Sequence, residues 1–191
     1  MANETRTRMA QNFQRWKESP QSRFWVISHK GRWNHLDWLT LVDELMQSEY
    51  WPLDLIAVGK ELAALRQMYA NVVRWRSSGQ PQSWVQARHG HWDHDDWEEL
   101  LESLKSSAFW PMDPDAVGWT LEEVKREWAN LCRWQSSGQP HLWVASHNGL
   151  WTSDDWQLLV ETLQRSDYWP IDLVGVANTV ARIQAAQRRV A

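Results

Sequence analysis

Residues 71–84 read Asn-Val-Val-Arg-Trp-Arg-Ser-Ser-Gly-Gln-Pro-Gln-Ser-Trp, and residues 130–143 repeat them as Asn-Leu-Cys-Arg-Trp-Gln-Ser-Ser-Gly-Gln-Pro-His-Leu-Trp, 59 positions later. The same interval relates fifteen of the seventeen tryptophans. They form five families with one member in each of three copies: Trp16/Trp75/Trp134, Trp25/Trp84/Trp143, Trp33/Trp92/Trp151, Trp38/Trp97/Trp156 and Trp51/Trp110/Trp169. Repetition at a fixed long interval is typical of proteins whose neighbouring units bury a shared core. The families therefore predict three stacked units with an aromatic core.

The three copies also predict the boundaries of the units. The interval of 59 residues places copies at 5–53, 54–112 and 113–171, of which the first is shorter, and leaves 172–191 without a tryptophan. This last segment is rich in Ala, Gln and Arg, which suits the polar outer face that the end of a repeat array needs. We interpret it as a C-terminal capping helix.

Glycines and prolines predict how each unit is divided. Gly followed by Pro, as in residues 77–81 and 136–140, is expected to end a helix near Trp75 and Trp134. The next segment, 84–92 in the second copy, has tryptophan at both ends and a glycine near its close. Its third copy contains Asn-Gly, a pair that adopts the positive φ of tight hairpin turns. We therefore expect a short β-hairpin in each unit.

A helix is predicted after each hairpin by a capping residue with an acid three positions later: Asn34/Asp37, Asp93/Asp96 and Thr152/Asp155. Apolar residues then follow at i, i+3, i+4 and i+7 in every copy. A further helix is expected from Asp54, Asp113 and Asp172, with a bend at Gly59 and Gly118. The predicted fold class is an α-rich α+β repeat protein whose units each contain helix, short β-hairpin and helix.

Composition limits the classes of function. The chain has 191 residues and a net charge of −4, so the broad positive field of most nucleic-acid-binding proteins is missing. No apolar run reaches the length of a membrane span, and the N-terminal residues lack the apolar centre of a signal peptide. We expect a cytoplasmic protein with no membrane or nucleic-acid partner. Cys132 is the single cysteine and is interpreted as a packing residue.

Asn and Arg recur three positions apart, one helical turn, immediately before the first tryptophan of each copy. These residues form the predicted Asn-Arg ladder: Asn12 and Arg15, Asn71 and Arg74, and Asn130 and Arg133. A row of guanidinium groups binds carboxylates or phosphates. The structural alternative is that each Arg stacks on a tryptophan and pairs with Asp37, Asp96 or Asp155 of its own unit.

Two tryptophans and a cluster of three histidines depart from the repeat pattern. Trp119 and Trp128 align with Lys60 and Tyr69, so the repeat does not require an indole there, and an exposed pair would suit a binding hot spot. His89, His91 and His94 lie among three aspartates, a composition that suits a divalent metal. The aligned residues are Lys30, Arg32 and His35 in the first copy and Asn148, Leu150 and Ser153 in the third, so the cluster is not repeated and we favour no metal and no cofactor.

Catalytic motifs are absent from the sequence: it contains no phosphate-binding glycine loop, no HExxH and no nucleophile elbow. We therefore predict a non-enzymatic repeat protein that binds a protein or peptide partner through the ladder, with Trp119 and Trp128 beside it. One alternative is a small-ligand or metal-binding protein that uses the three histidines. Another is a structural protein that assembles head to tail into homo-oligomers.

Overall fold

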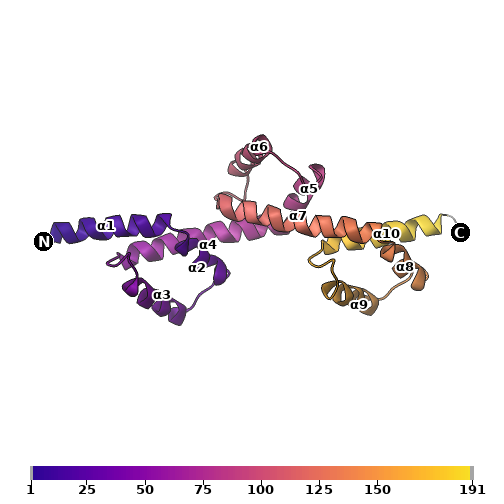
Figure 1. Cartoon of the computed structure of the whole chain (residues 1–191), viewed down its shortest axis with the longest axis horizontal. Coiled ribbons are helices and arrows are strands. Elements are labelled where there is room, and N and C mark those ends of the chain that lie inside the picture. The colour runs from indigo at the N-terminus through magenta and orange to yellow at the C-terminus, as the bar shows by residue number, and fades with distance from the viewer. Residues whose placement is uncertain (1, 190–191) are drawn as a thin grey trace. The chain divides into compact units, whose positions relative to one another are not determined.

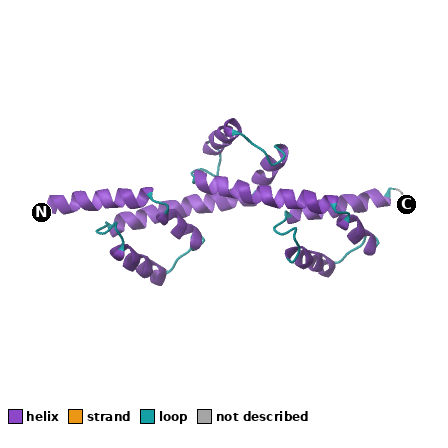
Figure 2. Ribbon diagram, viewed as in Figure 1, coloured by secondary structure: helices purple, strands orange, loops and turns teal. Residues whose placement is uncertain are grey.

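The computed structural model describes residues 2–189, and every regular element in that range is an α-helix (Figures 1 and 2). The helices are α1 (Ala2–Glu18), α2 (Gln21–Ser28), α3 (His35–Gln47), α4 (Leu55–Ser77), α5 (Gln80–Ala87), α6 (His94–Lys105), α7 (Pro114–Ser136), α8 (Gln139–Ser146), α9 (Ser153–Gln164) and α10 (Leu173–Arg188). Each repeat consists of one long helix followed by two short ones. In Figure 1, α2 and α3 form the connection from α1 to α4.

The predicted β-hairpins are wrong, and the α+β class is corrected to all-α. The segments expected to form hairpins contain α2, α5 and α8, each followed by a tight turn. In the third copy, Asn148 and Gly149 have φ of 50° and 68°, and the Gly149 N–H donates to the Val144 carbonyl at 3.0 Å. This six-to-one bond is the usual way a helix ends at a left-handed glycine. Positive φ is shared by hairpin turns and helix ends, so the Asn-Gly pair does not distinguish them.

The predicted helix starts are confirmed. The Asn34 side chain accepts hydrogen bonds from the first turn of α3 while the Asp37 carboxylate accepts from the Asn34 N–H, which completes a capping box. Thr152 and Asp155 form the same box at the start of α9. A capping box satisfies backbone donors that a helix leaves unpaired at its N-terminus. Local sequence therefore fixes these two boundaries.

Glycine and proline act together at the junction of α4 and α5. Gly79 has a φ of 77° and follows the last residue of α4, Ser77, by two positions. The helix restarts at once, because Pro81 occupies the first turn of α5, where its missing N–H costs nothing. The expected end near Trp75 is confirmed. No bend occurs at Gly59, which lies inside the continuous helix α4 and leaves room for the Trp38 ring 3.8 Å from the position of a Cβ.

The chain divides into two compact units, unit 1 with residues 1–77 and 98–117 and unit 2 with residues 78–97 and 118–191. The core of unit 1 includes Trp16, Val58 and Leu62, each at most 1% exposed. The core of unit 2 includes Trp134 and Val176 in equivalent places. Burial of apolar side chains stabilises each unit by roughly 25 cal/mol per Å² of surface removed from water.

Only one tryptophan family forms the fully buried core that the sequence predicts for all five. Trp16, Trp75 and Trp134 are each 1% exposed, whereas members of the other families are half-buried or exposed. The second and third families pair with each other inside each copy, with ring centroids 4.9 Å apart in Trp25 and Trp33 and 5.0 Å apart in Trp143 and Trp151. Such tilted pairs contribute about 0.5–1.5 kcal/mol beyond their burial. Most tryptophans therefore pack in pairs beside the short helices instead of filling a central core.

Two glycines of unit 2 provide a matched test of how tightly Trp128 packs against the turn after α5. Gly79 and Gly90 both have positive φ, but a Cβ on Gly90 would lie 2.9 Å from Cζ3 of Trp128, whereas a Cβ on Gly79 meets nothing within 4 Å. We expect Gly79→Ala to lower the free energy of unfolding by about 1–2 kcal/mol, the cost of a left-handed L-residue. Gly90→Ala should cost at least about 1 kcal/mol more, because the indole must also move. Urea unfolding followed by circular dichroism measures both losses, and equal losses would contradict the contact with Trp128.

Candidate functional site

The three ladder asparagines are buried and bind the loop that precedes the next long helix. Asn12, Asn71 and Asn130 are 8%, 2% and 8% exposed. Their Nδ2 groups donate to the carbonyls of Pro52, Pro111 and Pro170 at 3.1, 2.8 and 2.7 Å. Each bond joins residues 40 positions apart. The asparagines thus fasten one long helix to the start of the next.

The ladder arginines contact the same loop from its solvent-exposed side. The guanidinium carbons of Arg15, Arg74 and Arg133 lie 5.5, 5.6 and 5.4 Å from the ring centroids of Tyr50, Phe109 and Tyr168. Arg74 Nη2 also donates to the Ala108 carbonyl at 3.1 Å, and Arg133 Nη2 to the Asp167 carbonyl at 3.2 Å. Cation-π contacts of exposed groups contribute about 0.5–1 kcal/mol. Each Arg therefore holds the aromatic residue that precedes the Trp-Pro pair.

The acids expected to pair with the ladder arginines have other partners. Asp96 accepts from Arg88 Nε at 2.7 Å, and this bond lowers the pKa of the Asp96 carboxyl. Asp155 accepts from the backbone and hydroxyl of Thr152, which lowers its pKa, and lies 3.6 Å from His147 Nε2. Arg88 and His147 in turn lie against the tryptophans four positions before them, Trp84 and Trp143. These contacts couple α5 to α6 and α8 to α9.

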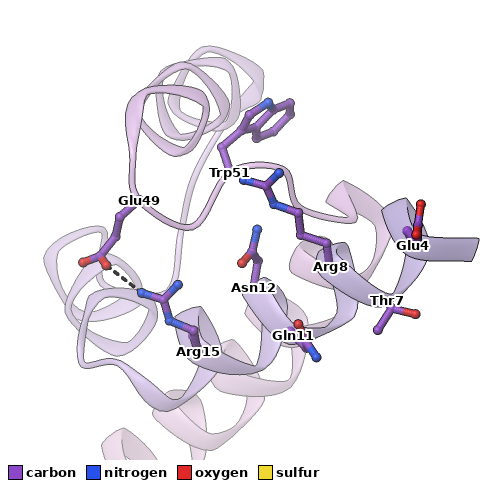
Figure 3. Close-up of a pocket in the computed structure, with 8 residues that line it drawn as sticks. All are labelled: Glu4, Thr7, Arg8, Gln11, Asn12, Arg15, Glu49 and Trp51. Atoms are coloured by element: carbon purple, nitrogen blue, oxygen red, sulfur yellow. Dashed lines mark hydrogen bonds and ion pairs between the residues drawn. The ribbon is translucent and has the colours of Figure 1, made fainter. Parts of the chain in front are cut away.

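A groove lies along α1 where the ladder of the first copy reaches the surface (Figure 3). Its volume is about 660 Å³. Residues from α1 and from the loop after α3 line it: Glu4, Thr7, Arg8, Gln11, Asn12, Arg15, Glu49 and Trp51. Figure 3 shows the Arg8 side chain directed toward Trp51, while Arg15 reaches Glu49 on the opposite side. We call this hollow the α1 groove.

The charges in the α1 groove are accessible to solvent. Arg15 Nη2 lies 2.6 Å from Glu49 Oε2, and the two side chains are 54% and 69% exposed. An ion pair this exposed contributes at most about 1 kcal/mol. Glu49 aligns with Ala108 in the second copy and Asp167 in the third, so the second copy has no acid at this position. The guanidinium group of Arg15 is thus able to exchange Glu49 for another carboxylate at little cost.

The Trp-Pro tryptophans stay at the surface in the other two copies. Trp110 is 38% exposed and Trp169 is 41% exposed, and each follows the aromatic residue that its ladder arginine covers. Trp51, Trp110 and Trp169 precede proline through a cis peptide bond. The repeat pattern predicts a core position for this family, and the exposure of Trp110 and Trp169 shows that this prediction is wrong. The adjoining Tyr50, Phe109 and Tyr168 and the groove residue Arg8 were also missed, although the recurrence of an aromatic before Trp-Pro was a signal for the former.

The residues that depart from the repeat pattern, Trp119, Trp128 and the histidine cluster, do not line the α1 groove. Trp119 is 46% exposed on α7, and Trp128 is half-buried farther along the same helix. His91 Nδ1 shares a hydrogen bond with the His89 carbonyl at 2.8 Å, and His94 begins α6. Across residues 2–189, no three His, Cys, Asp or Glu side chains gather in a metal-binding arrangement. Burial raises the pKa of the Cys132 thiol, which suits a packing residue.

The ladder asparagines are expected to contribute mainly to the stability of the fold. Asn71→Ala removes the donor to the Pro111 carbonyl and the acceptor for Gln67 and Arg74, so we expect the free energy of unfolding to fall by about 1–3 kcal/mol. Val73→Ala, on an exposed position of the same helix, is the control and should cost under about 0.5 kcal/mol. Urea unfolding of both variants checks this expectation. A loss for Asn71→Ala no larger than that of the control would show that the bond to Pro111 is dispensable.

The helices that the structure describes include none with the length and apolar character to cross a membrane. Comparison with protein-family models, with curated proteins and with solved structures found no match to this chain.

Proposed function

We propose that this chain is a non-enzymatic interaction module that binds an acidic peptide segment of a partner protein in the α1 groove. The observation that carries the proposal is the joint lining of one open groove by two arginines and a Trp-Pro tryptophan. Guanidinium groups bind carboxylates through paired hydrogen bonds, and an indole supplies apolar area at little cost in entropy. Arg and Trp are also the residue types that dominate the energy of protein interfaces.

The charged residues of the groove are two arginines, Arg8 and Arg15, and two acids, Glu4 and Glu49. An acidic segment is proposed because Glu49 is held only by its exposed ion pair with Arg15, which a partner carboxylate can replace. A partner carboxylate that replaces Glu49 meets a side chain already held over the Tyr50 ring, so little rotamer freedom is lost on binding. The volume of about 660 Å³ suits a few side chains of an extended peptide.

The second and third copies contain the same Asn, Arg and Trp residues at the aligned positions. Asn71, Arg74 and Trp110 of unit 1 align with Asn12, Arg15 and Trp51. Asn130, Arg133 and Trp169 in unit 2 complete the set. Several weak sites on one chain raise the total affinity for a partner that carries several acidic segments. Acidic clusters at intervals are therefore the expected feature of the partner.

A peptide library displayed on phage and selected on the intact protein tests the groove. We expect the selected peptides to be enriched in Asp and Glu. Their Kd should rise at least about tenfold with Arg8→Ala and Arg15→Ala together, since each charged hydrogen bond is worth roughly 1.5–3 kcal/mol. Arg6→Ala removes the same charge from an exposed position of α1 outside the groove and serves as the control. Equal weakening by all these changes would reduce the effect to net charge and refute the site.

The contribution of the repeat is tested by Arg15→Ala, Arg74→Ala and Arg133→Ala combined in one chain. For a peptide with several acidic clusters, we expect a larger loss of affinity than with Arg15→Ala alone, because each copy contributes a site. Isothermal titration measures both losses. If affinity for that peptide is unchanged in the triple variant, the ladder has no part in binding.

A further inference from the structure

A second hollow, in unit 2, lies among α5, α7 and α10 and has a volume of about 370 Å³. It brings together Trp128 and His89, two of the residues that the repeat pattern does not require. Their aligned residues in the copy before are Tyr69 and Lys30. We call this hollow the Trp128 pocket. It differs from the α1 groove in its unit and in its residues, so it does not rest on the peptide proposal.

The repeat supplies a control for the Trp128 pocket. In unit 1 a hollow of only about 10 Å³ shares three aligned positions with the pocket: Ile27, Tyr69 and Ala116 align with Gln86, Trp128 and Gly175. Arg23 lines that small hollow and forms an ion pair with Asp115 at 2.6 Å. These two residues align with Gln82 and Val174, which cannot form the pair. At these three aligned positions, the repeat architecture therefore does not require a pocket of this size.

The lining of the Trp128 pocket is polar, with one sign of charge. Its residues include Arg182 and His89 but no Asp or Glu. Arg182 takes the place that Glu123 occupies one copy earlier, so the charge at this position is reversed. Gln86 replaces Ile27, and Asn178 replaces Trp119. Amide groups and a guanidinium thus surround the pocket where the preceding copy has apolar or acidic residues.

Part of the pocket wall is held in place before any ligand arrives. Gln135 Nε2 donates to Thr179 Oγ1 at 2.7 Å, and Thr179 Oγ1 donates to the Gly175 carbonyl at 2.7 Å. Trp128 lies so close to Gly90 that a Cβ there would be 2.9 Å from its ring. An indole fixed in this way offers a flat surface on which another ring stacks at little entropic cost.

We infer that the Trp128 pocket binds a small planar anion, a flat ring that carries a carboxylate or phosphate group. The ring stacks on Trp128, and the anionic group accepts hydrogen bonds from the Arg182 guanidinium and from the amide of Asn178 or Gln86. The volume of about 370 Å³ is at the lower end of the range for small-molecule pockets, which matches a ligand of one or two rings.

Four probes with the same ring separate charge from shape: benzoate, phenyl phosphate, neutral benzamide and cationic benzamidine. Titrations of the intact protein are followed by NMR on ¹⁵N-labelled indole N–H groups, and the Trp128 signal is assigned by its loss in Trp128→Tyr, the residue found at the aligned position. We expect benzoate or phenyl phosphate to shift this signal with a saturable curve, and whichever of the two binds more tightly names the anionic group. Benzamide and benzamidine should bind at least about tenfold more weakly, because a hydrogen bond to a charged group is worth roughly 1.5–3 kcal/mol.

Variants on α10 locate the site. Arg182→Gln should raise the Kd of the bound anion at least about tenfold by the same reasoning, whereas Arg188→Gln, which removes an exposed charge outside the pocket, should leave it unchanged. Asn178→Trp introduces an indole that the repeat accommodates at position 119 and should abolish the shift by narrowing the pocket. No saturable shift with either anion, equal binding of benzamide, or equal effects of Arg182→Gln and Arg188→Gln would each overturn the inference.

Discussion

The hydrogen bond from a buried asparagine to a proline carbonyl 40 residues later is the constraint on which the fold depends. It joins the C-terminal part of one long helix to the residues that start the next. A buried amide and a buried carbonyl each cost about 1–3 kcal/mol when left unpaired. Any shift of the long helix along the loop that separates the two groups is therefore unfavourable. The neighbouring tryptophan at the fourth position after each asparagine, 1% exposed in every copy, supplies the apolar burial that makes the contact favourable.

The surface features follow from this constraint. Since the asparagine fixes the proline carbonyl, the aromatic residue and the tryptophan just before it are held in position. The ladder arginine then covers the aromatic ring, and the tryptophan is left partly exposed beside it. The same residues thus stabilise the loop and provide a guanidinium and an indole at the surface. A structural and a binding role are compatible here because the asparagine is buried while the arginine stays solvated.

Repetition also makes departures from the pattern informative. Where the three copies agree, the residues serve packing and capping, as in the paired tryptophans and the capping boxes. Where one copy departs, local chemistry changes while the backbone is preserved. The Trp128 pocket arises in this way, since an arginine, an asparagine and a glycine stand where the preceding copy has Glu123, Trp119 and Ala116. Function in an array of this kind is expected at such departures as well as along the repeated surface.

The sequence by itself determined the repeat, the starts of α3 and α9 and the end of α4, because capping residues, glycine and proline act on the backbone within a few positions. It did not determine that the segment after each Gly-Gln-Pro sequence is helical, since positive φ at Asn148 and Gly149 suits a hairpin and a helix end equally. The partners of Asn71 and Arg74, the exposure of Trp110 and the meeting of His89 with Trp128 were decided only by the tertiary structure. These contacts join residues 34–40 positions apart or depend on which side of a helix faces a neighbour, and local sequence spacing encodes neither.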